Sequence, residues 1–311
     1  MPAESPLARV LDRRASALGR HLPAALAGDP AGVHQARVAS RRLREALPVL
    51  AAAGLDRAAA RALRPVRLVT RMLGPVRELD VALGVLATHV AAHPEERAEG
   101  EVVRAWLERQ RAGRREAMAE GLDECRLARM WSRLGRIGRR LRAVEAHADA
   151  SWRRALGKRL QVRARLLADE IARTGMLYAP EPLHAVRIAC KKLRYAVELT
   201  GDLWPSRRTE PIERTLKAQQ DLLGRIHDLE ILTAFADRAC AELESPRRVS
   251  AARLAGDWHR ECRERHAKYL RARPGLVQAG DAALALGRRL VHSANQQDRR
   301  EVGATRPGAG R

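Results

Sequence analysis

Aromatic side chains are scarce in this chain, and their scarcity bears on the ligands that it can hold. Phe, Trp and Tyr make up 3% of the 311 residues, and there is a single Phe. Proteins that bind single-stranded nucleic acid usually stack the bases on aromatic rings. The composition therefore weakly favours a ligand that has no bases.

The sequence also has few cysteines and no long apolar run. The four cysteines, Cys125, Cys190, Cys240 and Cys262, form no CxxC pair, which is typical of reduced thiols in the cytosol. The first residues do not read as a signal peptide. No uncharged apolar stretch approaches the ~18 residues that span a membrane. We therefore expect a soluble, cytoplasmic protein without a membrane partner.

Catalytic and cofactor motifs are missing as well. The sequence contains no HExxH, Walker A, GxSxG or GxGxxG motif, each of which would indicate a specific chemistry. His259, Cys262 and His266 would share one face of a helix, but no fourth ligand for a metal such as zinc is evident. We therefore predict that the protein is not an enzyme and uses no metal or cofactor.

Basic residues, in contrast, are abundant. The chain has 59 Lys and Arg against 37 Asp and Glu, a formal net charge of +22 and a pI near 11.3. Such an excess repels itself in the compact state, so it indicates a polyanionic partner. A genome rich in Arg would give a similar composition without any ligand, and only five of these residues are Lys. The total charge alone does not decide between the two interpretations.

Apolar residues recur at three- and four-residue spacing along most of the chain, which predicts amphipathic helices and an all-α fold. Prolines and glycines are expected to divide some of these helices. The chain after Asn295 lacks the periodicity, so residues 295–311 are predicted to form a disordered tail. In three places we predict two successive helices with a break between them: 56–72 and 76–92, 209–223 and 228–244, and 248–272 and 276–292.

An internal repeat is the most informative feature of the sequence. Residues 33–47 read VHQARVASRRLREAL, and residues 183–197 read LHAVRIACKKLRYAV, at an offset of 150. Residues 73–81, LGPVRELDV, and residues 223–231, LGRIHDLEI, repeat at the same offset. Two matches in the same order and register indicate a tandem duplication. We therefore predict two helical bundles, at 1–147 and 150–292, related by pseudo-two-fold symmetry.

The first repeated segment places basic side chains in one row. At ~100° per residue, His34, Arg37, Arg41 and Arg44 fall in a stripe less than a quarter-turn wide, and Arg42 lies apart from it. The stripe is ~15 Å long, which suits several successive phosphates better than a single one. The apolar face of the same helix is predicted to hold Ala36, Leu43, Leu47 and Leu50.

The second segment repeats this geometry with His184, Arg187, Lys191 and Arg194, and Lys192 takes the place of Arg42. The guanidinium of Arg grips phosphate oxygens in pairs. A close row of cations is unfavourable unless it is exposed, paired or filled by an anion. A solvated charged face would explain one such row, but its repetition at identical spacing favours a binding surface. The matching apolar face is predicted to hold Val186, Leu193 and Val197.

Each repeated stripe begins with a histidine near the first turn of its helix. Free N–H groups and the helix dipole favour anions there. The same dipole opposes protonation of the imidazole, whereas a bound phosphate promotes it. His34 and His184 are therefore candidate donors whose charge depends on pH.

The second pair of repeated segments mixes charges of both signs, and two interpretations stay open. The carboxylates could lie in the first turn of a helix, where the helix dipole favours them, or they could orient the cations of the stripes. Basic residues on the preceding helices, Arg64, Arg67, Arg71, Arg214 and Lys217, are further candidates for the same surface. The charged residues of the two segments are Arg77, Glu78, Asp80, His227, Asp228 and Glu230.

The repeated H-x-x-R-x-x-x-[RK]-[RK]-x-R pattern, followed by an LGxxRxxD-type segment, resembles the CHAD family, the conserved histidine α-helical domain. The resemblance covers about 7–290 and implies an all-α fold of two bundles. It also implies binding of inorganic polyphosphate on a basic surface or pore, and association with polyphosphate granules. Some relatives carry a triphosphatase domain with an ExExK motif, which this sequence lacks. Carried over by position, the polyphosphate-binding residues would be His34, Arg37, Arg41, Arg42, Arg44, Arg77, His184, Arg187, Lys191, Lys192, Arg194 and Tyr195.

Three functions are consistent with these patterns. The leading hypothesis is a non-catalytic module that binds inorganic polyphosphate. The second is a protein that binds nucleic acid nonspecifically through its charge. The third is a metal-dependent phosphohydrolase that would use the histidines with the carboxylate pairs Glu78/Asp80 and Asp228/Glu230.

Overall fold

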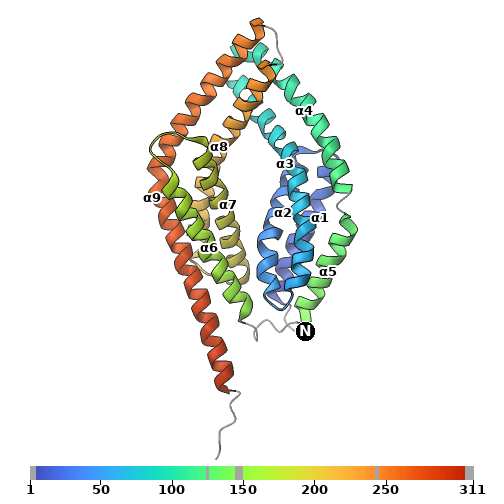
Figure 1. The fold of residues 1–311 in the computed structure, drawn as a ribbon, viewed down its shortest axis with the longest axis vertical. Helices are drawn as coiled ribbons and strands as arrows, with labels where there is room; N and C mark the ends of the chain where they lie inside the picture. Colours follow the sequence, from blue (N-terminus) through green and yellow to red (C-terminus); the bar gives the residue numbers. More distant parts are fainter. Residues whose placement is uncertain (1–4, 124–125, 144–149, 242–244, 305–311) are drawn as a thin grey trace, which may run out of the picture.

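The protein consists of two helical bundles that stand side by side and converge at one end (Figure 1), and they also contact each other elsewhere. The computed structural model describes residues 5–123, 126–143, 150–241 and 245–304. All regular elements in these ranges are helices, which confirms the predicted all-α fold. In the same ranges, no helix combines the length and apolarity needed to cross a bilayer.

The first bundle comprises α1 to α5, and the second comprises α6 to α9. Most helices that follow one another in sequence within a bundle pack together, whereas α5 packs on α1 and α3. Between the bundles, α3 and α4 contact α8 and α9, and α1 and α2 contact α6 and α7. The elements are α1 (Pro6–Leu26), α2 (Pro30–Ala51), α3 (Asp56–Ala92), η1 (Pro94–Glu96), α4 (Arg97–Asp123), α5 (Leu127–Ala143), α6 (Ser151–Arg173), α7 (Pro180–Leu203), α8 (Thr209–Ala241) and α9 (Ser245–Ala304).

The repeated segments occupy corresponding helices. Segment 33–47 lies in α2 and segment 183–197 in α7, whereas segments 73–81 and 223–231 lie in α3 and α8. These four helices border the space between the bundles (Figure 1). The arrangement is the one that a duplication would produce, and the duplication itself stays a prediction.

Three predicted helix breaks are wrong. Pro75 lies inside α3 and Pro274 inside α9, and α8 is continuous. Proline removes one backbone hydrogen bond and crowds the preceding turn, but tertiary packing overrides this local preference. Leu73, Val76 and Leu276, which flank the two prolines, are completely buried.

Helix α9 also extends through the first part of the predicted tail. Its end is at Ala304, so the prediction of disorder is wrong for residues 295–304, and residues 305–311 lie outside the described ranges. Arg154 of α6 donates a hydrogen bond to Asn295 over 3.1 Å, and Arg153 donates one to Gln297. This part of α9 is therefore held against α6 by polar contacts, and not by the periodic apolar residues that hold the other helices.

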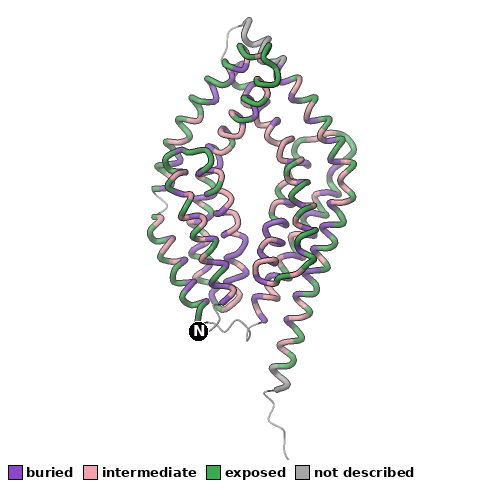
Figure 2. Tube along the Cα trace, turned by 180° about the vertical axis from the view of Figure 1, so that it is seen from behind, coloured by how far each residue is buried: buried purple, intermediate pink, exposed green. Residues whose placement is uncertain are grey.

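The predicted apolar faces of α2 and α7 are confirmed. Leu43, Leu47, Leu50, Leu193 and Val197 are completely buried, and Figure 2 shows such residues gathered inside each bundle. Because these faces point into the bundles, the basic stripes on the other side of α2 and α7 turn toward the space between them. Helix α2 begins where Asp29 accepts a hydrogen bond from the N–H of Gly32 over 2.7 Å, which sets the start of the helix that carries the first stripe.

A buried carboxylate joins the two bundles. Glu45 of α2 accepts hydrogen bonds from Arg159 Nε at 2.6 Å and from Arg163 Nε at 3.0 Å, both on α6. Its side chain is 7% exposed. Burial raises the pKa of this carboxyl, but the hydrogen bonds and charges of the two arginines outweigh burial, and the pKa lies below its ordinary value. The ion pair therefore stabilises the contact between α2 and α6 when Glu45 is ionised.

Glu45→Ala should lower the free energy of unfolding at pH 7 by about 3 kcal/mol, because it leaves two partly buried arginines without their carboxylate. Since the pKa of Glu45 is lowered by folding, its contribution is present above the ordinary carboxyl pKa and is lost as the pH falls through the folded value. Urea unfolding at several pH values measures both effects. Glu101→Ala, which breaks an exposed pair with Arg104, is the control and should change stability much less, because solvent screens an exposed pair. Equal losses in the two variants would contradict this account.

Candidate functional site

A cleft with a volume of about 560 Å³ lies between the bundles, bordered by α2, α3, α7 and α8. Nine Arg and Lys side chains line it against three carboxylates, so it carries a large excess of positive charge. The structure therefore brings both predicted stripes to one shared space. The predicted residues that line the cleft are His34, Arg37, Arg41, Arg42, Arg77, Arg187, Lys191, Arg194 and Tyr195.

Three predicted residues do not line this cleft. His184 is not among the lining residues, although its Nδ1 lies 3.0 Å from Nδ1 of His227, a residue that does line the cleft. Arg44 and Lys192 are not among the lining residues either. Burial lowers the pKa of both, and the charge of Arg163 on α6 lowers both further, after the charges of Arg67 and Arg41 in the case of Arg44.

The cations in the middle of the cleft have few partners. Arg37 donates a hydrogen bond to the carbonyl oxygen of Thr70 over 3.0 Å. Arg187 NH2 lies 3.8 Å from Asp228 Oδ1, and the buried Nε of Arg187 has no hydrogen-bond partner in the described part of the chain. A buried donor without a partner costs about 1–3 kcal/mol. An anion bound here would supply the missing acceptor.

Burial and mutual repulsion change the charge of the basic groups in the cleft. Desolvation, followed by the charges of Arg187 and Arg41, lowers the pKa of Lys191 to about 6. Burial and the charge of Arg187 lower the pKa of His227 to about 3, and burial with Arg77 lowers that of His34. The empty cleft therefore holds Lys191 and these histidines mostly uncharged at pH 7, and a bound anion would favour their protonation.

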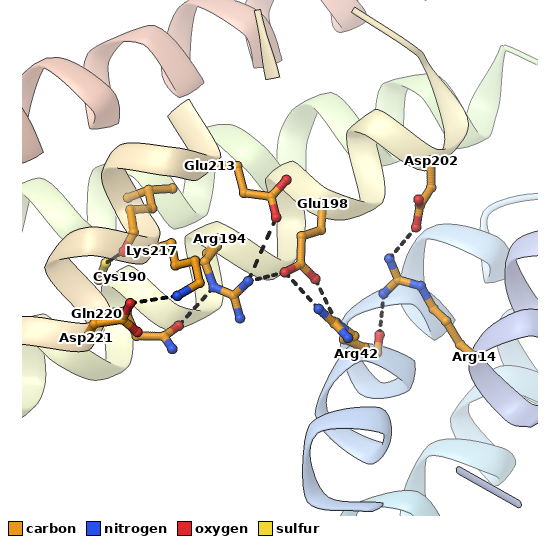
Figure 3. Close-up of polar contacts among 11 residues, drawn as sticks. Arg14, Arg42, Cys190, Arg194, Glu198, Asp202, Glu213, Lys217, Gln220 and Asp221 are labelled. Carbon is orange, nitrogen blue, oxygen red and sulfur yellow. Dashed lines mark hydrogen bonds and ion pairs between the residues drawn. The ribbon is translucent and has the colours of Figure 1, made fainter. Parts of the chain in front are cut away.

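Two of the predicted ligand residues are neutralised by a carboxylate that was not predicted (Figure 3). Glu198 of α7 accepts hydrogen bonds from Arg42 Nε at 2.8 Å and Arg42 NH2 at 3.1 Å. It also accepts one from Arg194, whose Nε donates to Gln220 over 2.9 Å. The hydrogen bond with Glu198 raises the pKa of Arg42. The spacing of four residues between Arg194 and Glu198 is the signal in the sequence that could have indicated this pair.

The mixed-charge segments divide into two groups. Glu78 and Asp228 line the cleft, and their charges raise the pKa of Arg187 against the larger effect of burial. Asp80 instead accepts a hydrogen bond from Arg111, and Glu230 accepts one from Tyr178. The carboxylates lie in the middle of α3 and α8, so the helix-start interpretation is wrong. Of these four carboxylates, Glu78 and Asp228 are the two that line the cleft and act on the stripe cation Arg187.

The repeated Leu-Gly pairs make room for the stripe arginines. A Cβ atom at Gly74 of α3 would lie 3.0 Å from Arg37 NH1, and one at Gly224 of α8 would lie 3.9 Å from Arg187 Nε. In both halves the glycine therefore faces the arginine of the neighbouring helix. The contact is tight in the first half and ordinary in the second.

The remaining candidates lie elsewhere. Of the additional basic residues proposed from the sequence, Lys217 lines the cleft, together with Arg225, which was not predicted. Cys262 and His266 are buried whereas His259 is exposed. Within the described ranges, no three His, Cys, Asp or Glu side chains are grouped so that they could hold a metal ion.

Fold and cleft together define a class of all-helical proteins in which two bundles enclose a strongly cationic cleft. Residues 9–237 match the family described as the CHAD domain. The chain therefore belongs to the CHAD family, as the repeated motifs indicated.

Solved structures agree with this assignment. The fold is similar to the crystal structure of the CHAD domain from the plant Ricinus communis, with 25% identity, a TM-score of 0.60, and coverage of 92% of this chain and 93% of that one. It is also similar to PptA from Streptomyces chartreusis, with 18% identity, a TM-score of 0.51, and coverage of 91% and 98%. The second likeness concerns the fold alone. No curated protein matches the sequence.

Gly74→Ala should weaken anion binding more than Gly224→Ala. The new methyl group at position 74 must displace the Arg37 guanidinium, which is held by Thr70, whereas position 224 has ordinary contact distance. Alanine favours the helix over glycine by up to ~1 kcal/mol, so neither variant should be much less stable. Binding of tripolyphosphate by calorimetry, together with thermal unfolding, measures both effects. Equal affinities of the two variants would contradict this role of Gly74.

Proposed function

We propose that the protein binds inorganic polyphosphate in the cleft between its bundles and performs no reaction on it. The observation that carries the proposal is the convergence of cations from both bundles on one space without matching carboxylates. Arg37 and Arg41 come from α2, Arg77 from α3, and Arg187 and Lys191 from α7. No carboxylate lies within 3.5 Å of any of the five in the described part of the chain. A linear polyanion supplies the missing charge at several points at once.

The chemistry of these groups fits phosphate chains. Each guanidinium presents a planar set of N–H donors that can bind two oxygens of a phosphate, and the arginines stay charged at every pH of interest. Burial lowers the pKa of Arg37 to about 10, and the nearby charge of Arg41 adds to that effect. A phosphate bound between the two would relieve this repulsion. Burial then strengthens the attraction because less water screens it.

Nucleic acid fits the cleft less well. Tyr195 is its one tyrosine, with no Trp or Phe beside it, and the Arg194 guanidinium already stacks on the Tyr195 ring at 4.9 Å. Tyr195 is also 5% exposed. Bases could not stack on this ring as they do in proteins that bind single strands.

A hydrolase is likewise less consistent with the geometry. The carboxylate pairs that would hold its metal ions are split, because Asp80 accepts a hydrogen bond from Arg111 and Glu230 accepts one from Tyr178, whereas Glu78 and Asp228 line the cleft. Binding without turnover would let the protein associate with stored polyphosphate. We accordingly expect association with polyphosphate granules in cells that contain them.

Arg37→Ala combined with Arg187→Ala should weaken polyphosphate binding about a hundredfold, since each arginine makes charge-assisted hydrogen bonds with phosphate. The control is Arg299→Ala with Arg300→Ala, which removes the same charge from exposed positions of α9 and should change affinity less than about threefold. Fluorescence anisotropy with labelled polyphosphate measures both, and circular dichroism checks the fold. Similar losses in the two double variants would indicate nonspecific attraction. Stronger binding of duplex DNA than of polyphosphate in direct competition would favour the nucleic-acid function.

Polyphosphate binding should take up protons. Because Lys191 has a pKa of about 6 in the empty cleft and would be charged beside phosphate, affinity should be highest near or below pH 6. It should then fall by up to about tenfold per pH unit as the pH rises. Calorimetry in buffers of different ionisation enthalpy measures the number of protons taken up on binding. The polyphosphate should be long, so that protonation of its terminal phosphates contributes little to this number.

Lys191→Arg is the matched variant for this measurement. Arginine stays protonated in both states, so the variant should bind with less proton uptake and a flatter pH profile. Equal proton uptake by wild type and Lys191→Arg would contradict the assignment to Lys191.

A further inference from the structure

Arginines of α3 and α5 form a second basic surface on the first bundle, apart from the cleft. Helix α5 lies on the side of this bundle that faces away from the second one (Figure 1). All of these arginines are exposed except Arg133, which is half-buried, and none of them lines the cleft. We call this set the outer arginine surface, and its members are Arg57, Arg61 and Arg64 of α3 and Arg129, Arg133, Arg136 and Arg140 of α5.

The arginines of each helix form one row. At ~100° per residue, the members on α5 fall within about 60° of one another, and so do those on α3. The row on α5 is ~16 Å long. Arg133 NH1 donates a hydrogen bond to the carbonyl oxygen of Arg61 over 3.1 Å, so the two rows meet at this contact. Because α3 and α5 pack together, and packed helices lie about 8–10 Å apart, two rows of guanidinium groups lie next to each other.

Carboxylates are missing from this surface. Helix α5 contains no Asp or Glu, and α3 has none between Asp56 and Glu78. In the described part of the chain, the ion pair of α5 joins Arg142 to Asp12 of α1 at 2.6 Å, on the opposite side of α5 from the row. No member of the outer arginine surface forms an ion pair within the same ranges. The charge of α5 is thus compensated toward α1 and uncompensated toward α3.

Other exposed arginines of this chain are paired on their own helices. Arg104, Arg214 and Arg260 each form an ion pair with a carboxylate three or four residues away. A general abundance of Arg in the sequence would give this mixed pattern on every outer helix. The separation of arginines from carboxylates on α3 and α5 therefore indicates a surface for an anionic partner.

The geometry favours a partner with two rows of phosphates. Guanidinium groups bind phosphate oxygens in pairs, and exposed residues beside the rows are small, such as Ala60, Ala128 and Ser132. A phosphate backbone can therefore come close to the arginines. A double helix presents one row of phosphates along each edge of a groove, whereas polyphosphate is a single chain. A double helix is also too thick to enter a cleft of about 560 Å³, but it can lie on this open surface.

Other anionic partners fit the surface less well. Single strands need rings for stacking, and Trp131, the aromatic residue of α5, lines a groove with α1 instead. Bilayer binding by an amphipathic helix needs exposed apolar side chains. In the described part of the chain, the large exposed ones lie outside α3 and α5, as Leu26, Met176 and Leu177 do.

We propose that the outer arginine surface binds the phosphate backbone of double-stranded DNA, at a site separate from the cleft. The surface has no Asn, Gln or Glu among its members to read the edges of the bases. Contacts with phosphates position a protein on the duplex and carry no sequence information. The binding is therefore independent of DNA sequence and depends steeply on salt. This inference does not depend on the proposed function of the cleft.

A variant that removes charge from both rows tests the proposal. It carries Arg57→Gln, Arg61→Gln, Arg136→Gln and Arg140→Gln, and it leaves Arg133 and its hydrogen bond in place. Affinity for a labelled 20-base-pair duplex, measured by fluorescence anisotropy, should fall about thirtyfold or more. The slope of log affinity against log salt should become less steep by about 3–4, because four phosphate contacts are lost. Unchanged duplex binding by this variant, once circular dichroism shows that it is folded, would overturn the proposal.

The matched control removes equal charge from exposed positions of the second bundle. It carries Arg207→Gln, Arg208→Gln, Arg299→Gln and Arg300→Gln, and its affinity for the duplex should fall less than about threefold. Equal losses in the two quadruple variants would show attraction by total charge alone and would overturn the proposal.

The cleft variants separate this site from the proposed function. Arg37→Ala with Arg187→Ala should leave duplex binding within about twofold of wild type, whereas the outer quadruple variant should bind tripolyphosphate like wild type in calorimetry. Loss of duplex binding in the cleft variant would place DNA in the cleft and overturn a separate site. Duplex binding that persists in a protein unable to bind polyphosphate would support the outer site and contradict only the proposed function.

Long polyphosphate and vesicles that contain phosphatidylglycerol are the other probes to compare at the same salt concentration. The outer quadruple variant should lose less affinity for either of them than for the duplex. A larger loss for polyphosphate would make the surface a second polyphosphate site. A larger loss for vesicles would make it a membrane contact, and either result would overturn the assignment to DNA.

Discussion

The repulsion among closely spaced cations is the constraint on which the rest of this structure depends. Four cations line the same cleft between the bundles: Arg37, Arg41, Arg187 and Lys191. In addition to burial, the charges of the three arginines lower the pKa of Lys191. The charge of Arg41 also lowers the pKa of Arg37 and that of Arg187. Such an arrangement is unfavourable in isolation. It persists because the apolar faces of α2 and α7 are buried inside their own bundles, so that the opposite faces of the two helices are brought together.

Carboxylates at the edges hold this arrangement without cancelling it. Glu45 ties α2 to α6, and Glu198 ties α2 to α7. Both lie beside the cationic centre, so the bundles are joined by ion pairs while the middle of the cleft keeps its charge. Loss of the proton from Lys191 relieves part of the remaining repulsion. The middle of the cleft thus keeps a charge that favours an anion.

Much of the fold and the position of the cleft could be predicted from the sequence, because they follow from local periodicity and from the repeat. The apolar positions of α2 and α7 are buried as their spacing indicated, and both stripes meet. The continuity of α3 through Pro75 and of α9 through Pro274 could not be predicted in the same way. In both cases burial of the flanking residues decides the outcome, and burial depends on helices distant in sequence.

The partners of individual cations were the least predictable part of the site. Helical angles place Arg194 in the second stripe, but they do not show that Glu198 joins it to Arg42 of the other bundle. Nor do they show that Arg44 and Lys192 are not among the residues that line the cleft. The role of Gly74 likewise becomes visible only when Arg37 of a neighbouring helix is placed against it. Such relations depend on contacts between helices, which the pattern of one helix does not contain.

The central claim is that unpaired cations of both bundles bind one phosphate chain together. The most direct measurement is the affinity for polyphosphate of defined length across a range of salt concentrations. The logarithm of the affinity should fall linearly with the logarithm of the salt concentration. The expected slope is about −4, because about five cations contact phosphates. Affinity that is weak at low salt, or that does not depend on salt, would contradict the account.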